Sequence, residues 1–229
     1  EIEIEPGENK ASMSIEVENP KLWFPWTVGE PNVYELRARL LIDGEVVDEY
    51  ETNFGIREVK LIKYSDESPN SKVFYFTVNG VKVWAKGANW VTPDLFYPAV
   101  DEGRYRRLLR MAKEANMNMI RVWGGGILES DLFYRLCDEM GLMVWQDFPF
   151  ACGIYPEDEG YLELVRREAE HIVKRLRNHP CLVLWCGNNE CEWIWRMRTG
   201  EPVEEMPGYR IFHELLPRIC AELDPTRPY

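Results

Sequence analysis

The chain has 229 residues, a formal net charge of −12 and 45% hydrophobic residues, enough for one or two folded domains with a real core. Such an acidic balance excludes duplex nucleic acid and anionic membrane surfaces as expected partners, because both would repel it. No apolar run approaches the roughly 20 residues of a membrane-spanning helix. The first residue is Glu1 rather than Met, so we expect an internal piece of a longer protein.

The six cysteines include no C-x-x-C pair, and most of them lie in apolar surroundings. We expect buried free thiols in a reducing, cytoplasmic setting, with a disulfide or a metal site as the alternative. Only three histidines are present and they show no paired spacing, so the sequence predicts no metal site. The nine tryptophans are either large core residues or flat platforms for the C–H faces of sugar rings.

The first sixty residues predict short β-strands. Apolar and polar residues alternate over 12–18 and 34–42, Asp43-Gly44 is a hairpin turn signal, and 45–54 supplies the returning strand. About four such strands are too few for a complete sandwich. We therefore expect residues 1–62 to be the C-terminal part of an immunoglobulin-like β-sandwich domain.

Beyond residue 72 the pattern changes to strands that alternate with helices. Asn79-Gly80 predicts a hairpin whose second strand runs into Lys86–Trp90, and apolar strands follow at 117–123, 142–148 and 181–187. Apolar residues at helical spacing predict helices that start at Asp101 and at Ser130, and further ones over 162–176 and 209–223. Two architectures fit this order: an open doubly wound sheet and half of a (β/α)₈ barrel.

The residues that follow the strands favour the barrel. Polar and aromatic residues come directly after each strand: Asn89 and Trp90, Arg121 and Trp123, Asp147, and Asn188-Asn189-Glu190. In a barrel these strand ends converge on one mouth, where active sites lie. A doubly wound nucleotide-binding sheet needs a glycine-rich loop after its first strand, and Gly87-Ala-Asn-Trp is not one. We therefore expect residues 63–229 to be the first half of a TIM barrel, strands one to four.

Glu190 is the first candidate for chemistry. A carboxyl group at a barrel mouth among tryptophans loses water, which suits a general acid, whereas the alternative is a Glu that caps the next helix or pairs with an arginine. Arg121 and Asp147 either support a catalytic carboxylate or form a structural bridge between neighbouring strands. Gly124-Gly125-Gly126 is a weak phosphate-loop candidate, because no Lys-Ser/Thr follows it.

Several segments together resemble glycoside hydrolase family 2 and, within it, the β-mannosidase branch. These segments are Gly87-Ala-Asn-Trp-Val, Met117-Asn-Met-Ile-Arg-Val-Trp-Gly-Gly-Gly, Trp145-Gln-Asp-Phe, Arg177-Asn-His-Pro and Leu184-Trp-Cys-Gly-Asn-Asn-Glu. Upstream, Leu22-Trp-Phe-Pro-Trp and Phe54-Gly-Ile-Arg-Glu resemble the end of that family's immunoglobulin-like domain. The resemblance extends over nearly the whole chain, in the family's order and spacing.

The resemblance implies a retaining exo-β-mannosidase that needs no cofactor or metal and acts on β-linked mannosides or oligosaccharides. Glu190 matches the general acid/base and Asn189 the asparagine that contacts the sugar 2-hydroxyl. Arg121 resembles the arginine that supports the nucleophile, and Trp123 a wall of the sugar subsite. Further pocket residues implied by the resemblance are Asp147, Asn89, Trp90 and Asp94. The proline of Val91-Thr92-Pro93-Asp94 stands one place later than the β-mannosidase pattern has it, which weakens the match at Asp94.

A retaining glycosidase needs two carboxyl groups, and the family's nucleophile is a Glu on the seventh barrel strand. We expect that residue to lie outside this chain, so that the isolated piece is inactive and self-associates through its open barrel edges. Two alternatives stay open. One is another family 2 specificity, β-glucosaminidase or β-galactosidase, and the other is a catalytically inactive carbohydrate-binding homologue.

Overall fold

The computed structural model describes residues 6–65 and 68–229, and a four-stranded parallel sheet forms its centre. The strands are β6 (Gly87–Trp90), β7 (Met119–Val122), β8 (Met143–Asp147) and β9 (Leu182–Cys186), and they lie side by side in chain order. A doubly wound sheet reverses its strand order at a switch point, whereas a (β/α)₈ barrel adds each strand beside the last. The sequential order therefore confirms the first half of a barrel.

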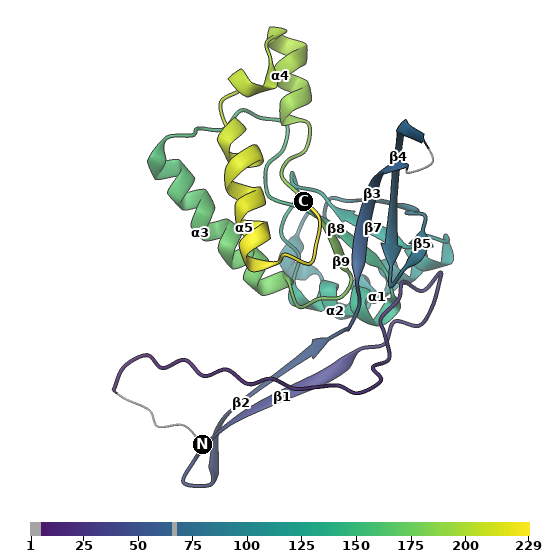
Figure 1. Ribbon diagram of the computed structural model, residues 1–229, viewed down its shortest axis with the longest axis vertical. Helices are drawn as coiled ribbons and strands as arrows, with labels where there is room; N and C mark the ends of the chain where they lie inside the picture. The colour runs from purple at the N-terminus through teal and green to yellow at the C-terminus, as the bar shows by residue number, and fades with distance from the viewer. Residues whose placement is uncertain (1–5, 66–67) are drawn as a thin grey trace.

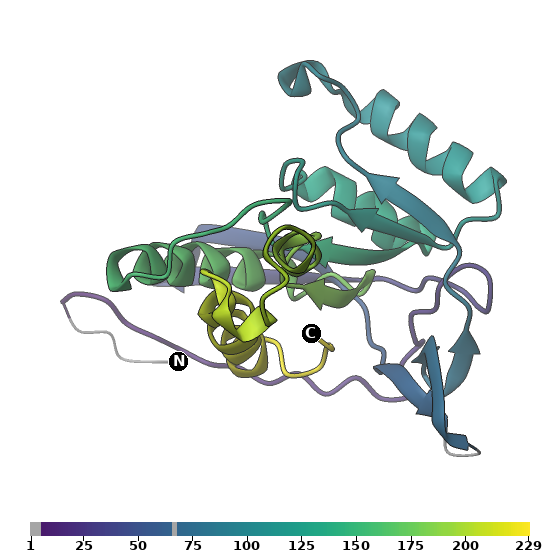
Figure 2. The same cartoon turned by 90° about the horizontal axis from the view of Figure 1, so that it is seen from above.

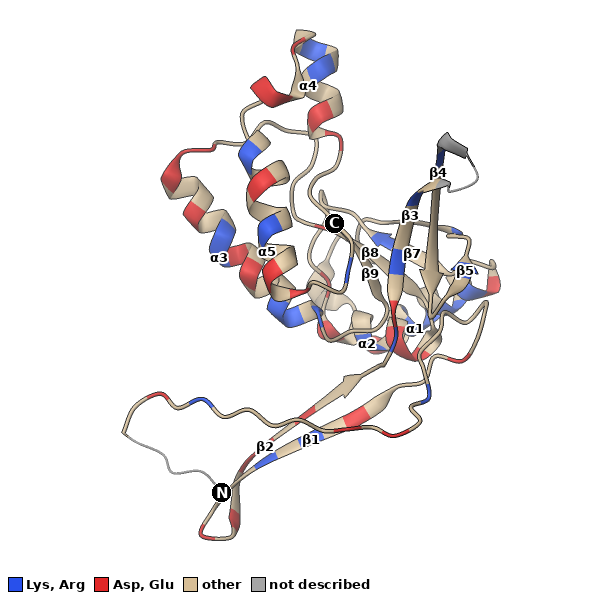
Figure 3. Cartoon of the chain, in the orientation of Figure 1, with Lys and Arg blue, Asp and Glu red and all other residues tan. Residues whose placement is uncertain are grey.

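Helices α1 (Glu102–Glu114), α2 (Asp131–Met140) and α3 (Glu159–Leu176) connect the four strands (Figures 1 and 2). The predicted stripe of α3 is confirmed, because every one of its members is buried: Leu162, Val165, Ala169, Ile172, Val173 and Leu176. The outer face of α3 carries charges of both signs (Figure 3). There Arg166 pairs with Glu163 and with Glu170, as expected for a solvated helix face.

The helix starts follow the expected capping pattern only in part. The Asp101 side chain accepts a hydrogen bond from the Arg104 N–H at 2.7 Å and so caps α1. Ser130 occupies the N-cap position of α2, but its side chain caps no backbone N–H. Gly141 ends α2 in the left-handed conformation, with φ at 69°, as predicted.

Two hairpins precede the parallel sheet. Strands β1 (Tyr34–Ile42) and β2 (Glu45–Phe54) form an antiparallel pair that projects from the rest of the molecule (Figure 1). Strands β3 (Val59–Ser65), β4 (Ser68–Val78) and β5 (Val81–Val83) form a three-stranded antiparallel sheet. Both predicted turns have positive φ at their two central residues, 52° and 86° at Asp43-Gly44 and 50° and 78° at Asn79-Gly80. These values are those of the tight turns that suit twisted hairpins.

The strand predicted over residues 12–18 is wrong. That segment is irregular, and Met13 and Ile15 are 86% and 71% exposed. Its alternating pattern supplies one apolar face, but a strand also needs a partner for its backbone N–H and C=O groups, and the segment pairs with none of the described strands. Up to residue 60 the described chain therefore forms β1, β2 and the start of β3, fewer strands than predicted.

The C-terminal part differs from the prediction in two ways. The helix expected over 209–223 is present and continuous, but it widens into a π-helical turn, η3 (Ile211–Leu215), before α5 (Leu216–Leu223), which packs beside α3. Pro217 lies in the first turn of α5 and has no N–H for a regular helical bond, which explains the change to π-helical bonding. Helix α4 (Cys191–Thr199) was not predicted as an element, and the short 3₁₀ turns η1 (Tyr97–Ala99) and η2 (Val203–Glu205) complete the described chain.

Two segments, the one before β1 and the short one between β2 and β3, are fastened beneath the parallel sheet, and together they are called the linker here. Trp23 is fully buried, and its indole N–H donates to the Asp138 carbonyl at 2.9 Å. The indole N–H of Trp26 donates to the Met117 carbonyl at 2.9 Å, and Arg57 Nε to the Pro180 carbonyl at 2.9 Å. These contacts join the linker to the amino ends of the barrel strands. None of the helices in the described part of the chain has the length and apolar character needed to cross a bilayer.

Candidate active site

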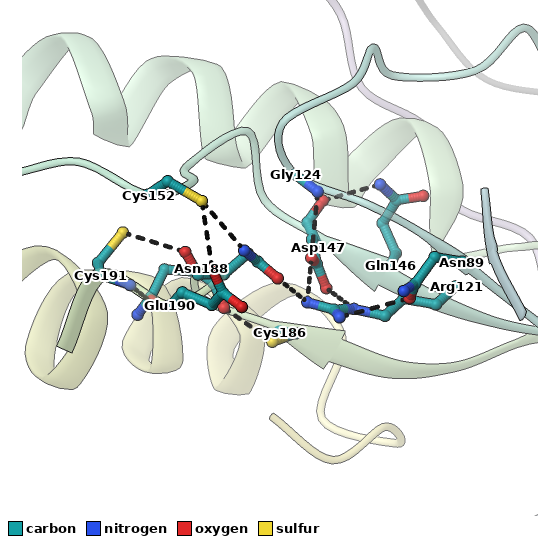
Figure 4. A network of polar contacts seen from close by, with 11 residues as sticks. Asn89, Arg121, Gly124, Gln146, Asp147, Cys152, Cys186, Asn188, Glu190 and Cys191 are labelled. Carbon is teal, nitrogen blue, oxygen red and sulfur yellow. Dashed lines mark hydrogen bonds and ion pairs between the residues drawn. The ribbon is translucent and has the colours of Figure 1, made fainter. Parts of the chain in front are cut away.

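Arg121 and Asp147 form an ion pair at the carboxyl ends of β7 and β8. Arg121 donates from Nη2 to Asp147 Oδ2 at 2.8 Å and from Nε to Oδ1 at 3.2 Å. The Gly124 N–H adds a third bond to Oδ2 at 3.1 Å (Figure 4). The Asp147 side chain is 0% exposed and that of Arg121 23%. Three donors hold this buried carboxylate in one orientation, so the bridge between neighbouring strands is present.

The remaining donors of Arg121 join two further strands to this pair. Nη2 donates to Asn189 Oδ1 at 2.9 Å and Nη1 to Asn89 Oδ1 at 3.5 Å. Asn89 belongs to β6, and Asn189 lies in the loop that follows β9. Arg121 therefore connects the ends of all four parallel strands, as convergence on one barrel mouth requires.

Glu190 directly follows Asn189. Its backbone φ is 62°, in the left-handed region that residues other than glycine rarely adopt. Its position is fixed by backbone bonds of its neighbour, because Asn189 N–H donates to the Phe150 carbonyl at 2.9 Å and the Asn189 carbonyl accepts from Cys152 N–H at 2.8 Å. The Glu190 side chain does not cap α4, since Asn188 Oδ1 accepts from Cys191 N–H at 3.1 Å instead. Within the described residues no arginine or lysine forms an ion pair with Glu190. Its carboxyl group is therefore available for chemistry, but the residue is exposed, so the predicted loss of water is wrong for this chain.

Glu190 is one of the residues that line an open groove of about 650 Å³. Aromatic side chains from several elements line this groove, among them Phe74, Trp145, Trp193 and Tyr229. The one polar contact recorded for the Glu190 carboxyl within the described chain is with Cys152, whose sulfur lies 3.5 Å from Oε2. Flat aromatic faces around one free carboxyl group suit a ligand with apolar C–H faces and hydroxyl groups.

Trp90 and Asp94 lie apart from this cluster. The Trp90 ring packs against Phe133, and its N–H donates to Glu129 Oε1 at 2.8 Å, in the layer between sheet and helices. Asp94 pairs with Arg104 Nη1 at 2.9 Å. The alternation of side chains along β6 explains the position of Trp90, because Asn89 takes the face that meets Arg121.

Trp123 lies on the loop after β7, and its ring covers the backbone of Gly125. A Cβ atom on Gly125 would lie 2.1 Å from the ring. At Gly124 and Gly126 an added Cβ would meet the carbonyls of Phe148 and Val91 at 2.4 Å and 2.1 Å. The three glycines therefore let neighbouring strand-end loops approach closely, which explains them without a phosphate ligand.

Two residues near the site were missed by the sequence analysis. Glu129 is fully buried and accepts hydrogen bonds from Trp90, Tyr97 and Tyr105. Burial, followed by the hydrogen bond to Glu129, raises the pKa of Tyr105 well above its usual range. Cys152 is the other, with φ at 54°. Asp131 lies two residues beyond Glu129, so the sequence did not single out Glu129 as a buried acid, and nothing in the sequence distinguished Cys152 from the other thiols.

All six cysteines are free, which excludes the disulfide alternative. Four of them are buried as expected, Cys186 is partly buried and Cys152 is exposed. Burial raises the pKa of Cys186 to about 11 and that of Cys220 to about 12. Across residues 6–65 and 68–229 no cluster of His, Cys, Asp and Glu is arranged to hold a metal ion.

Comparison with known proteins assigns the chain to a family. The model for "Glycosyl hydrolases family 2" matches residues 1–57, and that for "Glycosyl hydrolases family 2, TIM barrel domain" matches residues 72–229. The chain is 37% identical to a β-mannosidase B of Thermothelomyces thermophilus over 99% of its own length, and 36% identical to a β-mannosidase of Capra hircus over all of it. It spans 28% and 27% of the length of these two relatives.

Solved structures agree. A β-D-mannosidase from Dictyoglomus thermophilum superposes with a TM-score of 0.87 at 52% identity, covering 93% of this chain and 26% of that one. A β-glucuronidase 3 of Bacteroides uniformis superposes with a TM-score of 0.71 at 29% identity, covering 91% and 24%. The match to the barrel model over most of the sequence shows that this chain belongs to glycosyl hydrolases family 2.

Proposed function

We propose that the protein containing this chain is a retaining exo-β-mannosidase, in which Glu190 is the general acid/base. The observation that carries the proposal is the free carboxyl group of Glu190 at the mouth of the half barrel, beside the Arg121 cluster. Its support from comparison is the similarity to proteins named β-mannosidase, at 36–52% identity over nearly the whole chain.

Glu190 has two tasks in the proposed reaction. In the first step its protonated carboxyl gives a proton to the glycosidic oxygen as the bond to the anomeric carbon breaks. In the second step the resulting carboxylate takes a proton from water, which attacks the glycosyl-enzyme and releases mannose with its configuration retained. An exposed carboxyl group without an ion-pair partner can exchange protons with both the leaving group and water.

The second carboxyl group of a retaining mechanism is proposed to lie outside this chain. Asp147 is a poor nucleophile, because Arg121 and the Gly124 N–H occupy both of its oxygens. The chain covers little more than a quarter of its relatives' length, so the relatives have room for the nucleophile on a later strand.

Asn189 is proposed to bind the sugar 2-hydroxyl. Its Oδ1 accepts from Arg121 and one N–H of its amide donates to Cys152 Sγ at 3.4 Å. A primary amide has two N–H donors, so one of them remains for a substrate hydroxyl. Arg121 and Asn89 hold this amide and the neighbouring strand ends in place, and the Trp123 ring forms one wall of the subsite.

The test is hydrolysis of aryl β-glycosides by the full-length protein that contains this chain. We expect selective release from the β-mannoside and a loss of about 10²–10⁴-fold in rate for Glu190→Gln, the range of general acid–base catalysis. Glu163→Gln is the control, because Glu163 is an exposed carboxylate on α3 that pairs with Arg166. Adding azide to Glu190→Ala should restore turnover and yield a β-mannosyl azide, since azide needs no general base.

The other outcomes decide among the alternatives. Release from a β-glucosaminide, β-galactoside or β-glucuronide with the same dependence on Glu190 would keep the mechanism and change the specificity. A folded protein that hydrolyses none of these substrates would overturn the proposal and favour a carbohydrate-binding role.

A further inference from the structure

Cys152 and Glu190 form a pair of left-handed residues at the barrel mouth. Their φ angles are 54° and 62°, although neither is a glycine. The loops that carry them are joined by a parallel bridge between Ala151 and Asn189, with Cys152 N–H donating to the Asn189 carbonyl at 2.8 Å. Unfavourable backbone conformations persist where the surrounding structure imposes them, and they cluster at functional sites. The backbone thus holds a thiol directly against the proposed acid/base.

The side chains continue this arrangement as a directed chain of hydrogen bonds. Arg121 has only donors, so Asn189 must turn its oxygen toward Arg121 and its NH₂ group away from it. That NH₂ group donates to Cys152 Sγ at 3.4 Å. The sulfur is then occupied as an acceptor, and its own S–H donates to Glu190 Oε2 at 3.5 Å (Figure 4). Each step fixes the direction of the next.

We propose that Cys152 is a positioning residue for Glu190. This inference rests on the acid/base role proposed above. The S–H group holds Oε2 of the carboxyl, which leaves Oε1 to face the leaving oxygen and, later, water. A thiol suits this task because it is a weak donor. Its contact with Oε2 orients the carboxyl group without placing a charged partner beside it.

The dependence on the leaving group distinguishes positioning from packing. A leaving group that is already a stable anion needs no proton from Glu190, whereas a poor leaving group depends on that proton. Loss of a positioning contact therefore slows kcat/KM for poor leaving groups selectively. Loss of packing around the site slows kcat/KM for every substrate by the same factor.

The kinetic test compares Cys152→Ala and Cys152→Ser in the full-length protein, using aryl β-mannosides of increasing leaving-group pKa. Cys152→Ala keeps the Cβ and so the same cost of positive φ. We expect its kcat/KM to fall about tenfold or more for the poorest leaving groups and less than about twofold for dinitrophenyl mannoside. Cys152→Ser restores a donor and should lie between Cys152→Ala and the unchanged protein. Cys220→Ala, which removes a thiol from the core of α5, should leave the leaving-group dependence unchanged. An equal loss for all leaving groups, or no loss, would overturn the proposal.

A second measurement tests the contact without any substrate. The S–H stretch of Cys152 is assigned from the infrared difference between the unchanged protein and Cys152→Ala. A hydrogen bond to a carboxyl group lowers its frequency, so we expect the band to lie below that of a free thiol and to move upward in Glu190→Ala. A band at the free-thiol frequency in both proteins would overturn the proposal, even if the enzyme is active. A protein that cleaves no glycoside would overturn the proposed function, and the positioning role with it, while the infrared band would still report whether the contact exists.

Discussion

Replacing Arg121 by Met tests whether the ion pair with Asp147 stabilises the fold at the barrel mouth. The substitution removes two of the three hydrogen bonds to a carboxylate that is 0% exposed and leaves only the Gly124 N–H. Removing one partner of a buried pair costs about 3–5 kcal/mol, because the other charge stays buried and unpaired. Solvent reaches the 23% exposed side chain of Arg121, so we expect the lower end, about 3 kcal/mol.

The double variant Arg121→Met/Asp147→Asn separates the orphaned charge from lost packing. Asp147→Asn removes the carboxylate charge at nearly constant shape. We therefore expect the double variant to be more stable than Arg121→Met alone, although each single substitution destabilises the protein. Urea unfolding of the full-length protein, followed by tryptophan fluorescence, gives the change in midpoint at constant slope. A cost below about 1 kcal/mol for Arg121→Met, or a double variant less stable than the single one, would refute this reasoning.

Two further predictions concern glycine and cysteine positions. Gly87→Ala would place a Cβ 1.9 Å from the Met119 carbonyl, so we expect loss of soluble folded protein, whereas Gly44→Ala, with φ at 86° and open space around it, should cost only about 1 kcal/mol by urea unfolding. Alkylation at pH 8, read by peptide mass spectrometry, should modify exposed Cys152 first. Burial raises the pKa of Cys186 to about 11, so its thiolate fraction at pH 8 is about one in a thousand, and its rate should rise about tenfold per pH unit up to that value. Equal labelling of both thiols would contradict this order.

Turn dipeptides and helical periodicity predicted the fold well because the structures they specify depend on neighbouring residues in the chain. Asp43-Gly44 and Asn79-Gly80 supply the positive φ angles of tight turns without reference to the rest of the chain. The apolar stripe of α3 likewise records which helix face is buried. Residues 12–18 show the limit, because their alternation is real but a strand forms only beside another strand. Period alone does not reveal that partner.

The site was predictable in its polar members and less so in its contacts. Asn89, Arg121, Asp147 and Asn189 were singled out because polar residues at the ends of apolar strands meet at one barrel mouth, and the structure brings them together. Successive side chains of β6 point to opposite faces, so Asn89 meets Arg121 and Trp90 lies on the helix side. Matching the Gly87-Ala-Asn-Trp motif as a whole does not separate these two faces. The contact between Cys152 and Asn189 depends on loop backbone that no periodicity describes.

The linker contacts beneath the sheet make the barrel part of this chain dependent on the residues that precede it. Arg57 donates to the carbonyls of Pro180 and Leu182, and Arg227 to those of Leu182 and His179, all at the start of β9. A barrel piece that begins after Arg57 would lack that residue, and it would expose the apolar surface that the fully buried Trp23 covers. Through Arg57 the strand that leads to Glu190 is thus anchored from outside the barrel, and the segment that precedes the barrel contributes to the rigidity of this strand.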